Sequence, residues 1–162
     1  MATWSLYRSI EASLYDFITT QAISDSLTDI AGNSINFAVG RKNKNSPSLP
    51  LITLYWDSDP THDITFIGSF TRFGPHTLII DIYALTETDR LDLTKWVVDT
   101  INNGWTYYSY ADSANPDSPT KTESGRINVQ AFLENTRVNL GQTIDETDAH
   151  RHRISISVRK EG

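Results

Sequence analysis

Residues 76–104 read "HTLIIDIYALTETDRLDLTKWVVDTINNG", and the spacing of apolar residues changes within this stretch. In its first part Leu78, Ile80 and Ile82 alternate with other side chains, which is typical of a strand that buries one face. In its second part apolar residues recur at intervals of three and four, which indicates a helix with one apolar stripe. A strand followed at once by an amphipathic helix predicts a domain in which helices cover a sheet.

Signals at both ends fix the extent of this helix. Thr86 stands where a hydroxyl accepts a hydrogen bond from an N–H group of the first turn. Glu87 and Asp89 add negative charge near the positive end of the helix dipole. Gly104 follows the last turn, a position that often needs a left-handed backbone. We therefore expect a helix between Thr86 and Gly104 whose apolar stripe contains Leu93, Val97 and Ile101.

The same kind of pattern extends toward both ends of the chain. Residues 4–23 carry apolar side chains at helical spacing, with Thr3 or Ser5 placed to cap the start. Gly74-Pro75 separates two alternating segments and predicts a hairpin between them. The expected strands lie at 35–39, 51–56, 62–73, 76–85, 105–110, 126–140 and 150–158.

Two polar segments rich in turn-forming residues interrupt these elements, at 40–50 and 111–125. Both are predicted to be mobile loops. The order of helix, strands, helix and strands predicts the α+β class, with a mostly antiparallel sheet and two helices packed on one face. A length of 162 residues suits a single domain spanning residues 1–162.

Composition excludes several classes of chemistry. The chain has no cysteine, so disulfides, thiolate metal sites and a cysteine nucleophile are absent. A net charge of −6 argues against general affinity for nucleic acid, because phosphates require a basic face. We see no signal peptide at the N-terminus and no apolar stretch of membrane-spanning length, so no membrane partner is expected.

The closing stretch "DAHRHRISISVRKEG" poses a choice between a metal site and a plain strand. His150 and His152 would share one face of a strand, a spacing that zinc tolerates, but a zinc site needs further ligands. The other histidines, His62 and His76, have no fixed relation to this pair. The preferred interpretation is a pair of histidines at the edge of the sheet, without a metal or other cofactor.

The opposite face of that strand carries a stripe of arginines, namely Arg151, Arg153 and Arg159. The stripe is either a solvated surface or a subunit contact in which guanidinium groups meet carboxylates across an interface. Reversing two of these charges to glutamate is expected to leave the monomer folded and to abolish assembly. On the strand at 76–85, alternation places Ile79 and Tyr83 on the face of the sheet that the helices do not cover. This face mixes apolar and polar side chains, which suits contact with a neighbouring subunit.

Other constellations have structural explanations that we prefer to chemical ones. The basic residues Arg41, Lys42 and Lys44 of the first polar loop either dock on an acidic partner, graze DNA or form a plain surface loop. The aromatic run at 105–110 is expected to pack in a core or interface rather than to stack bases. Three acid pairs fall in turns or on a helix surface, and we expect no catalytic role and no enzyme activity from Asp57/Asp59, Asp89/Asp92 and Asp145/Asp148.

The stretch "HTLIIDIYALTETDRLDLTKWVVDTI" resembles bacteriophage head–tail neck proteins, in particular tail-terminator-like proteins. Many of these run a strand of the form apolar-Ile-Asp-Ile-Tyr-Ala into a helix of the form Arg-x-Asp-Leu. The ending "ENTRVNLGQTIDETDAHRHRISISV" is similar to the same family in its order of strand, polar loop and returning strand. The loops at 40–50 and 111–125 have no counterpart in the family. The match at the strand and helix is carried by Asp81, Tyr83, Arg90, Asp92 and Leu93.

The resemblance implies a structural duty in the virion. Such proteins assemble in the host cytoplasm into rings, commonly hexamers, between the tail tube and the head–tail connector, and DNA passes transiently through the lumen. The six basic residues named above are the expected subunit or partner interface. The alternatives are a small binding or adaptor domain and another phage tail or baseplate component, while an enzyme ranks last because no residue cluster has the spacing that catalysis requires.

Overall fold

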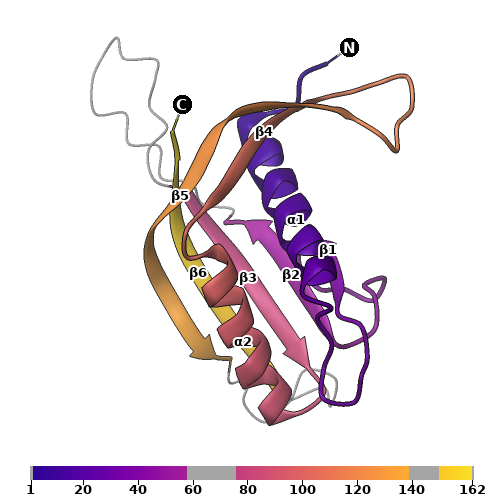
Figure 1. Cartoon of the computed structure of the whole chain (residues 1–162), viewed down its shortest axis with the longest axis vertical. Coiled ribbons are helices and arrows are strands. Elements are labelled where there is room, and N and C mark those ends of the chain that lie inside the picture. The colour runs from indigo at the N-terminus through magenta and orange to yellow at the C-terminus, as the bar shows by residue number, and fades with distance from the viewer. Residues whose placement is uncertain (1, 58–75, 139–149, 162) are drawn as a thin grey trace.

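The computed structural model describes residues 2–57, 76–138 and 150–161, which form two helices and six strands (Figure 1). The expected strand at 62–73 and its hairpin turn lie outside the described residues. Helices and strands occur in the order α1 (Leu6–Ser24), β1 (Asn36–Val39), β2 (Leu51–Trp56), β3 (His76–Ala84), α2 (Glu87–Ile101), β4 (Trp105–Ala111), β5 (Thr120–Arg137) and β6 (His150–Glu161).

Both helices begin at the caps that their sequences provide. Ser5 caps α1 by accepting a hydrogen bond from the backbone N–H of Arg8 at 3.3 Å. Thr86 caps α2 in the same way, because its Oγ1 accepts from the N–H of Asp89 at 3.2 Å. Satisfying these N–H groups stabilises each helix start by about 1 kcal/mol. The helix predicted between Thr86 and Gly104 is therefore confirmed, cap included.

The two helices cover the same face of the sheet (Figure 1). One stripe of α1 and one stripe of α2 are fully or nearly fully buried against alternate residues of β2, β3 and β6. This layer is the main core, and each buried aliphatic side chain adds roughly 1.5–3 kcal/mol relative to exposure. Its central members are Ile10, Leu14, Ile18, Ile52, Leu54, Leu78, Ile80, Ile82, Leu93, Val97, Ile101, Ile154, Ile156 and Val158.

The α+β class is confirmed, but the expected description of the sheet as mostly antiparallel is corrected to mixed. The strand order is β1-β2-β3-β6-β5-β4, and β1 pairs with β2 in parallel while the other neighbouring pairs are antiparallel. The apolar pattern of a strand carries no direction, because alternation reads the same both ways. Parallel pairing needs a connection that crosses the sheet, and residues 40–50 supply it.

The second expected loop is also corrected. Residues 111–125 are not all loop, because β4 ends at Ala111 and β5 begins at Thr120, where these two residues pair. The segment 120–124 is exposed and has no apolar alternation, so periodicity could not identify it. Backbone pairing with β4 holds it extended, and the hairpin arches across the N-terminal end of α1 (Figure 1).

Gly104 sits where only glycine fits. Its φ is +75°, and its N–H donates to the carbonyl of Ile101 at 2.9 Å, closing the end of α2. A Cβ atom at this position would lie 2.1 Å from the carbonyl oxygen of Ile127. This close approach joins the end of α2 to β5 and explains the glycine that the sequence places there.

No helix in the described parts of the chain is both long enough and apolar enough to span a bilayer.

Candidate functional site: a basic pocket on the outer face of the sheet

The loop at 40–50 is carried to the outer face of the sheet by the chain path. Because β1 and β2 are parallel neighbours, the segment between them must cross one face, and α1 and α2 already cover the other. The guanidinium of Arg41 lies 5.1 Å from the ring centre of Tyr55 on β2. The ammonium of Lys42 lies 5.2 Å from the ring centre of Tyr83 on β3. These cation–π contacts hold basic side chains over the outer face.

A pocket of about 500 Å³ lies between this loop and the sheet. Its walls combine four basic side chains, two tyrosines, one asparagine and one carboxylate from four separate segments of the chain. The structure therefore brings four of the six expected interface residues together in one place. The lining residues are Arg41, Lys42, Asn43, Lys44, Tyr55, Asp81, Tyr83 and Arg151.

Asp81 is the hub on which the floor of this pocket is built. Its carboxylate is buried and accepts hydrogen bonds from Arg151 Nη2 at 2.9 Å and from Arg153 Nε at 3.0 Å. The hydroxyl of Tyr55 donates to Asp81 Oδ2 at 3.1 Å. The register explains the meeting, because Asp81 lies directly opposite both Thr53 on β2 and Arg153 on β6. Two guanidinium groups thus receive their orientation from one carboxylate within the same chain.

Electrostatics distinguish the two arginines. The hydrogen bond to Asp81 raises the pKa of Arg153, so this side chain stays charged. Burial raises the pKa of the Tyr55 phenol, with the nearby charge of Asp81 as the second cause, so Tyr55 stays protonated and donates. The buried Nε of Arg151 has no hydrogen-bond partner among the described residues. The pocket therefore holds several cations against one carboxylate, which favours an anionic ligand.

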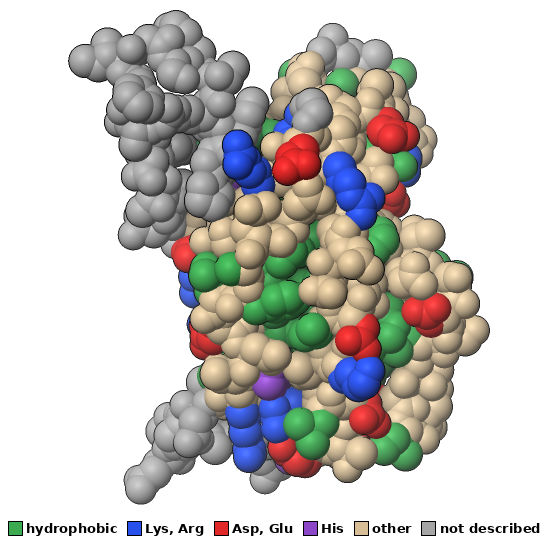
Figure 2. Space-filling model, turned by 60° about the vertical axis from the view of Figure 1, so that its left-hand side comes forward, with side chains coloured by type: hydrophobic (Ala, Val, Ile, Leu, Met, Phe, Trp, Pro, Cys, Tyr) green, Lys and Arg blue, Asp and Glu red, His purple; other side chains and the backbone are tan. Residues whose placement is uncertain are grey.

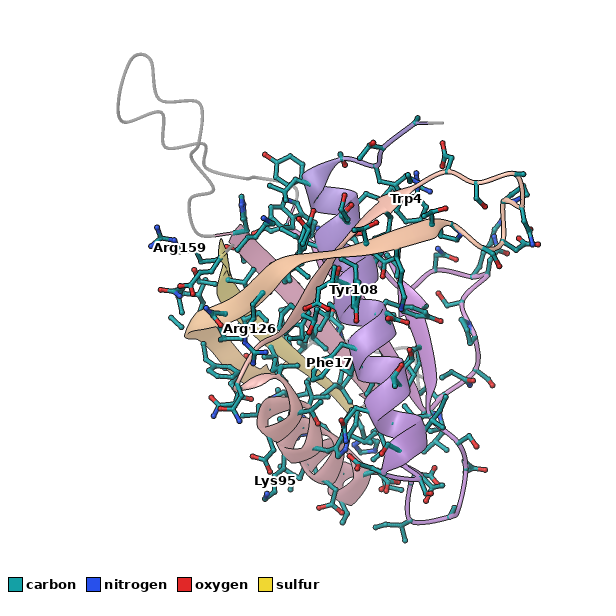
Figure 3. All side chains as sticks on the ribbon, turned by 45° about the horizontal axis from the view of Figure 1, so that its top comes forward. Trp4, Phe17, Lys95, Tyr108, Arg126 and Arg159 are labelled. Atoms are coloured by element: carbon teal, nitrogen blue, oxygen red, sulfur yellow. The ribbon has the colours of Figure 1, made fainter. Side chains whose placement is uncertain are left out.

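Arg153 and Arg159 lie apart from the pocket lining. Arg153 borders the network through Asp81, whereas Arg159 is exposed near the other end of β6, opposite Asn128 of β5. Figure 3 shows Arg159 directed away from the body of the molecule. The arginine stripe is therefore divided into a structural pair and one solvent-facing residue. Reversing Arg151 and Arg153 would place carboxylates against Asp81, so that test would unfold the outer face as well as probe assembly.

The interpretation of His150 and His152 as sheet-edge residues is corrected, because β6 is an interior strand between β3 and β5. His152 is buried, with Nδ1 against Arg90 Nη1 and Nε2 against Asn135 Oδ1. Because a guanidinium only donates, Nδ1 must accept and Nε2 carries the proton. Burial and the charge of Arg90 lower the pKa of His152.

The other described histidines are likewise not arranged as a metal site. His150 Nδ1 lies 3.4 Å from Glu87 Oε2, and the hydrogen bond from Arg90 lowers the pKa of Glu87 to about 2. His76 pairs with Val158, at the far end of β3 from His150 and Ala84. Among the described residues no group of three or more histidine or acidic side chains could hold a metal ion.

Among the described residues of the acid pairs, Asp89 has a structural role. Asp89 accepts from the N–H of Ile30 at 3.0 Å and from the hydroxyl of Thr86 at 2.8 Å, so it ties a loop to the cap of α2. Asp59, Asp145 and Asp148 lie outside the described residues.

On β4 the aromatic residues pack under α1, confirming the expected core role. Trp105 stacks on Phe17, Trp4 stacks on Tyr110 and the backbone N–H of Tyr108 donates to Ser13 Oγ.

Sequence reasoning did not assign Asn43, Tyr55, Asp81 and Tyr83 to the pocket. A signal for Asp81 was present, because it is the lone charge within an apolar strand and must find a partner when buried. Arg153 has the outward parity that such a partner needs. The strand order that places β6 beside β3 was the missing information.

Comparison of the chain with models of known protein families and with curated proteins finds no match.

Proposed function

We propose that this protein is a non-enzymatic assembly protein that forms a ring of six copies at the neck or tail of a bacteriophage particle. The resemblance of the β3–α2 stretch to tail-terminator-like proteins suggests this duty. The ring joins the tail tube to the head connector, and DNA passes through its lumen. A chain of net charge −6 suits such a lumen, because an acidic wall does not retain DNA.

The observation that carries this proposal is the convergence of the loop cations and Arg151 on one preorganised pocket. Head-to-tail rings need contact between unlike surfaces, and a basic pocket requires an acidic counterpart. Cations held by tyrosine rings and by a buried carboxylate lose little freedom on binding. The pocket is therefore suited to receive carboxylates of a neighbouring copy or of a connector protein.

The test uses charge reversal at exposed residues outside the buried core. Arg41 and Lys44 are exposed, so Arg41→Glu with Lys44→Glu changes the pocket and spares Asp81. Lys95→Glu is a control of the same kind, because Lys95 is an exposed residue of α2 that pairs with Asp99. Native mass spectrometry and negative-stain microscopy of each variant, alone and with tail tubes, report ring formation.

We expect rings from the parent chain and from Lys95→Glu but not from the double variant. Rings that persist in the double variant would remove the pocket from the interface. A parent chain that stays monomeric alone and on tail tubes would overturn the ring itself.

A second candidate is a monomeric binding or adaptor domain, favoured by the size of the pocket, about 500 Å³. One titration with a small polyanion distinguishes the two functions. A monomer that binds a small polyanion such as inorganic pyrophosphate, with binding lost in the double variant, would favour the adaptor. Ring formation without such binding favours the assembly protein.

A further inference from the structure

We propose that the free edge of β1 in one copy pairs with the free edge of β5 in the next, so that the sheets of neighbouring copies join head to tail. This inference rests on the proposed ring and names a backbone contact between its subunits that lies beside the basic pocket. Unpaired strand edges present backbone donors and acceptors that readily accept another strand.

The first edge belongs to β1. It is the terminal strand of the sheet and pairs only with β2 among the described residues. The N–H of Asn36 donates to the carbonyl of Pro50, the residue before β2. The N–H of Gly40 donates to the carbonyl of Leu54 within β2. Because N–H groups alternate in direction along a strand, the N–H of Val39 points away from the sheet. Val39 as a whole residue is 49% exposed, so the described residues leave this end of β1 accessible to a partner.

The second edge belongs to the C-terminal half of β5. β4 pairs with β5 only over Thr120–Ile127, and no other described strand pairs with that side of β5 beyond this range. Every residue of the range 130–137 is exposed, although all of them except Gln130 and Leu133 have a partner on β6. Phe132 and Leu133 are among the large exposed apolar side chains, and Figure 2 shows apolar side chains gathered on this side of the molecule.

The lengths of the two edges agree. β1 has four residues. β5 contains irregularities between Val129 and Ala131 and between Phe132 and Glu134, after which Glu134–Arg137 continue in regular register with β6. Bulges bend a strand and limit how far another strand pairs along it. The regular segment after the second irregularity therefore offers β1 a contact of matching length, and the bends supply curvature that a closed ring needs.

Strand direction and charge both favour a second copy as the occupant. β2, β3, β6 and β5 alternate in direction and β1 follows β2, so β1 and β5 run in opposite directions. A rotation axis parallel to the strands preserves these directions, so β1 and the next copy's β5 meet as an antiparallel pair. Glu134 lies on the outer face, where it accepts from Ser155 Oγ at 3.3 Å. The cations at 41–44 follow β1 on that same face and would meet this carboxylate.

Cysteine crosslinking tests the pairing, because the chain has no cysteine of its own. Ala38 aligns with Thr53 on the outer face, and Thr136 aligns with Arg153 on the same face. Asn135 aligns with Ile154 and points to the opposite face. A shift of one residue exchanges the faces of a strand, so Ala38 can meet Glu134 or Thr136 but not Asn135 when like faces join.

We expect oxidation to link Ala38→Cys with Thr136→Cys, or with Glu134→Cys, into ladders of several copies on a non-reducing gel. The pair Ala38→Cys with Asn135→Cys is the matched control and should stay single. Rings without any ladder, or equal ladders in the control, would overturn the edge pairing and leave the ring intact. Dimers from Ala38→Cys alone would show β1 meeting β1 and would also overturn it. Absence of both rings and ladders would overturn the inference together with the proposed function.

A backbone variant gives an independent readout. Val39→Pro removes the outward N–H, whereas Val39→Ala shortens the side chain and keeps that N–H. We expect rings from the alanine variant and a loss of rings from the proline variant, with circular dichroism reporting whether each monomer is folded. Rings from a folded proline variant would show that the outward N–H of β1 takes no part.

Discussion

The two faces of the sheet are both buried in part, but by different means. The helix-covered face is closed by aliphatic side chains such as Ile80 and Ile156, which have no exposed surface. The outer face is closed by Tyr55, Asp81 and the two arginines that bond to it. Aliphatic packing is indifferent to direction and stabilises the fold, whereas charged hydrogen bonds are directional and shape a surface. The comparison teaches that one sheet can close its two faces by different means, one by apolar packing and the other by a buried carboxylate with its charged partners.

The largest effect is expected where the covered face loses volume. Ile80→Ala removes a fully buried side chain from the core cluster and should lower the free energy of unfolding by about 4 kcal/mol. Ile79 is the adjacent residue on the outer face and lies outside that cluster. Ile79→Ala should therefore cost less, about 2 kcal/mol, in urea unfolding followed by circular dichroism. Equal losses would mean that the two faces do not differ in packing.

The second-largest effect is expected from replacing Asp81, the carboxylate to which the arginines of the outer face bond. Asp81→Ala leaves two guanidinium groups without their carboxylate and should lower the free energy of unfolding by about 3 kcal/mol. Asp81→Asn keeps the shape and one acceptor oxygen, so its loss should be smaller. The same urea titrations measure both variants. A near-neutral Asp81→Ala would contradict the idea that this carboxylate orients Arg151 and Arg153.

On the helix-covered face of the sheet, His152 should make the free energy of unfolding depend on pH. Burial and Arg90 lower the pKa of His152 below its ordinary value of 6.5. A lowered pKa in the folded state means that His152 contributes stability above about pH 6.5, and that this part is lost as the pH falls below it. The free energy of unfolding should therefore decrease between about pH 7.5 and about pH 5.5.

His152→Gln is the control for this titration, because it keeps an acceptor and a donor for Arg90 and Asn135 but has no proton to gain. Its free energy of unfolding should change less than that of the parent chain over the same interval. Parallel curves for the two proteins would assign the pH dependence to other groups.

Local signals in the sequence were sufficient for the elements and insufficient for their neighbours. The caps at Ser5 and Thr86 and the glycine at 104 act within one turn of chain, so the helices could be predicted with their ends. Alternation placed the described strands, but the shared face expected for Ile127, Val129, Ala131 and Leu133 is wrong, because irregularities in β5 after Val129 and after Phe132 interrupt the alternation. Alternation could not place 120–124, where backbone pairing rather than burial holds the chain extended.

The site depended on topology and was therefore only partly predictable. The loop cations and Arg151 were expected at an interface, but their meeting depends on a parallel β1–β2 pair and on β6 lying beside β3. Neither feature leaves a local pattern. Arg159 has the same parity as Arg151 and lies far along β6, because parity fixes a face and not a position on it.

The smallest expected effect on stability sharpens the comparison most. Arg41→Glu with Lys44→Glu changes exposed side chains whose loss uncovers no core, so the free energy of unfolding should shift by no more than about 0.5 kcal/mol. Lys95→Glu should behave alike in the same urea titration, although it breaks an exposed pair with Asp99. Stability that is unchanged while assembly is lost would separate recognition from folding. A marked loss of stability would instead show that the loop cations hold the outer face closed, as Asp81 does.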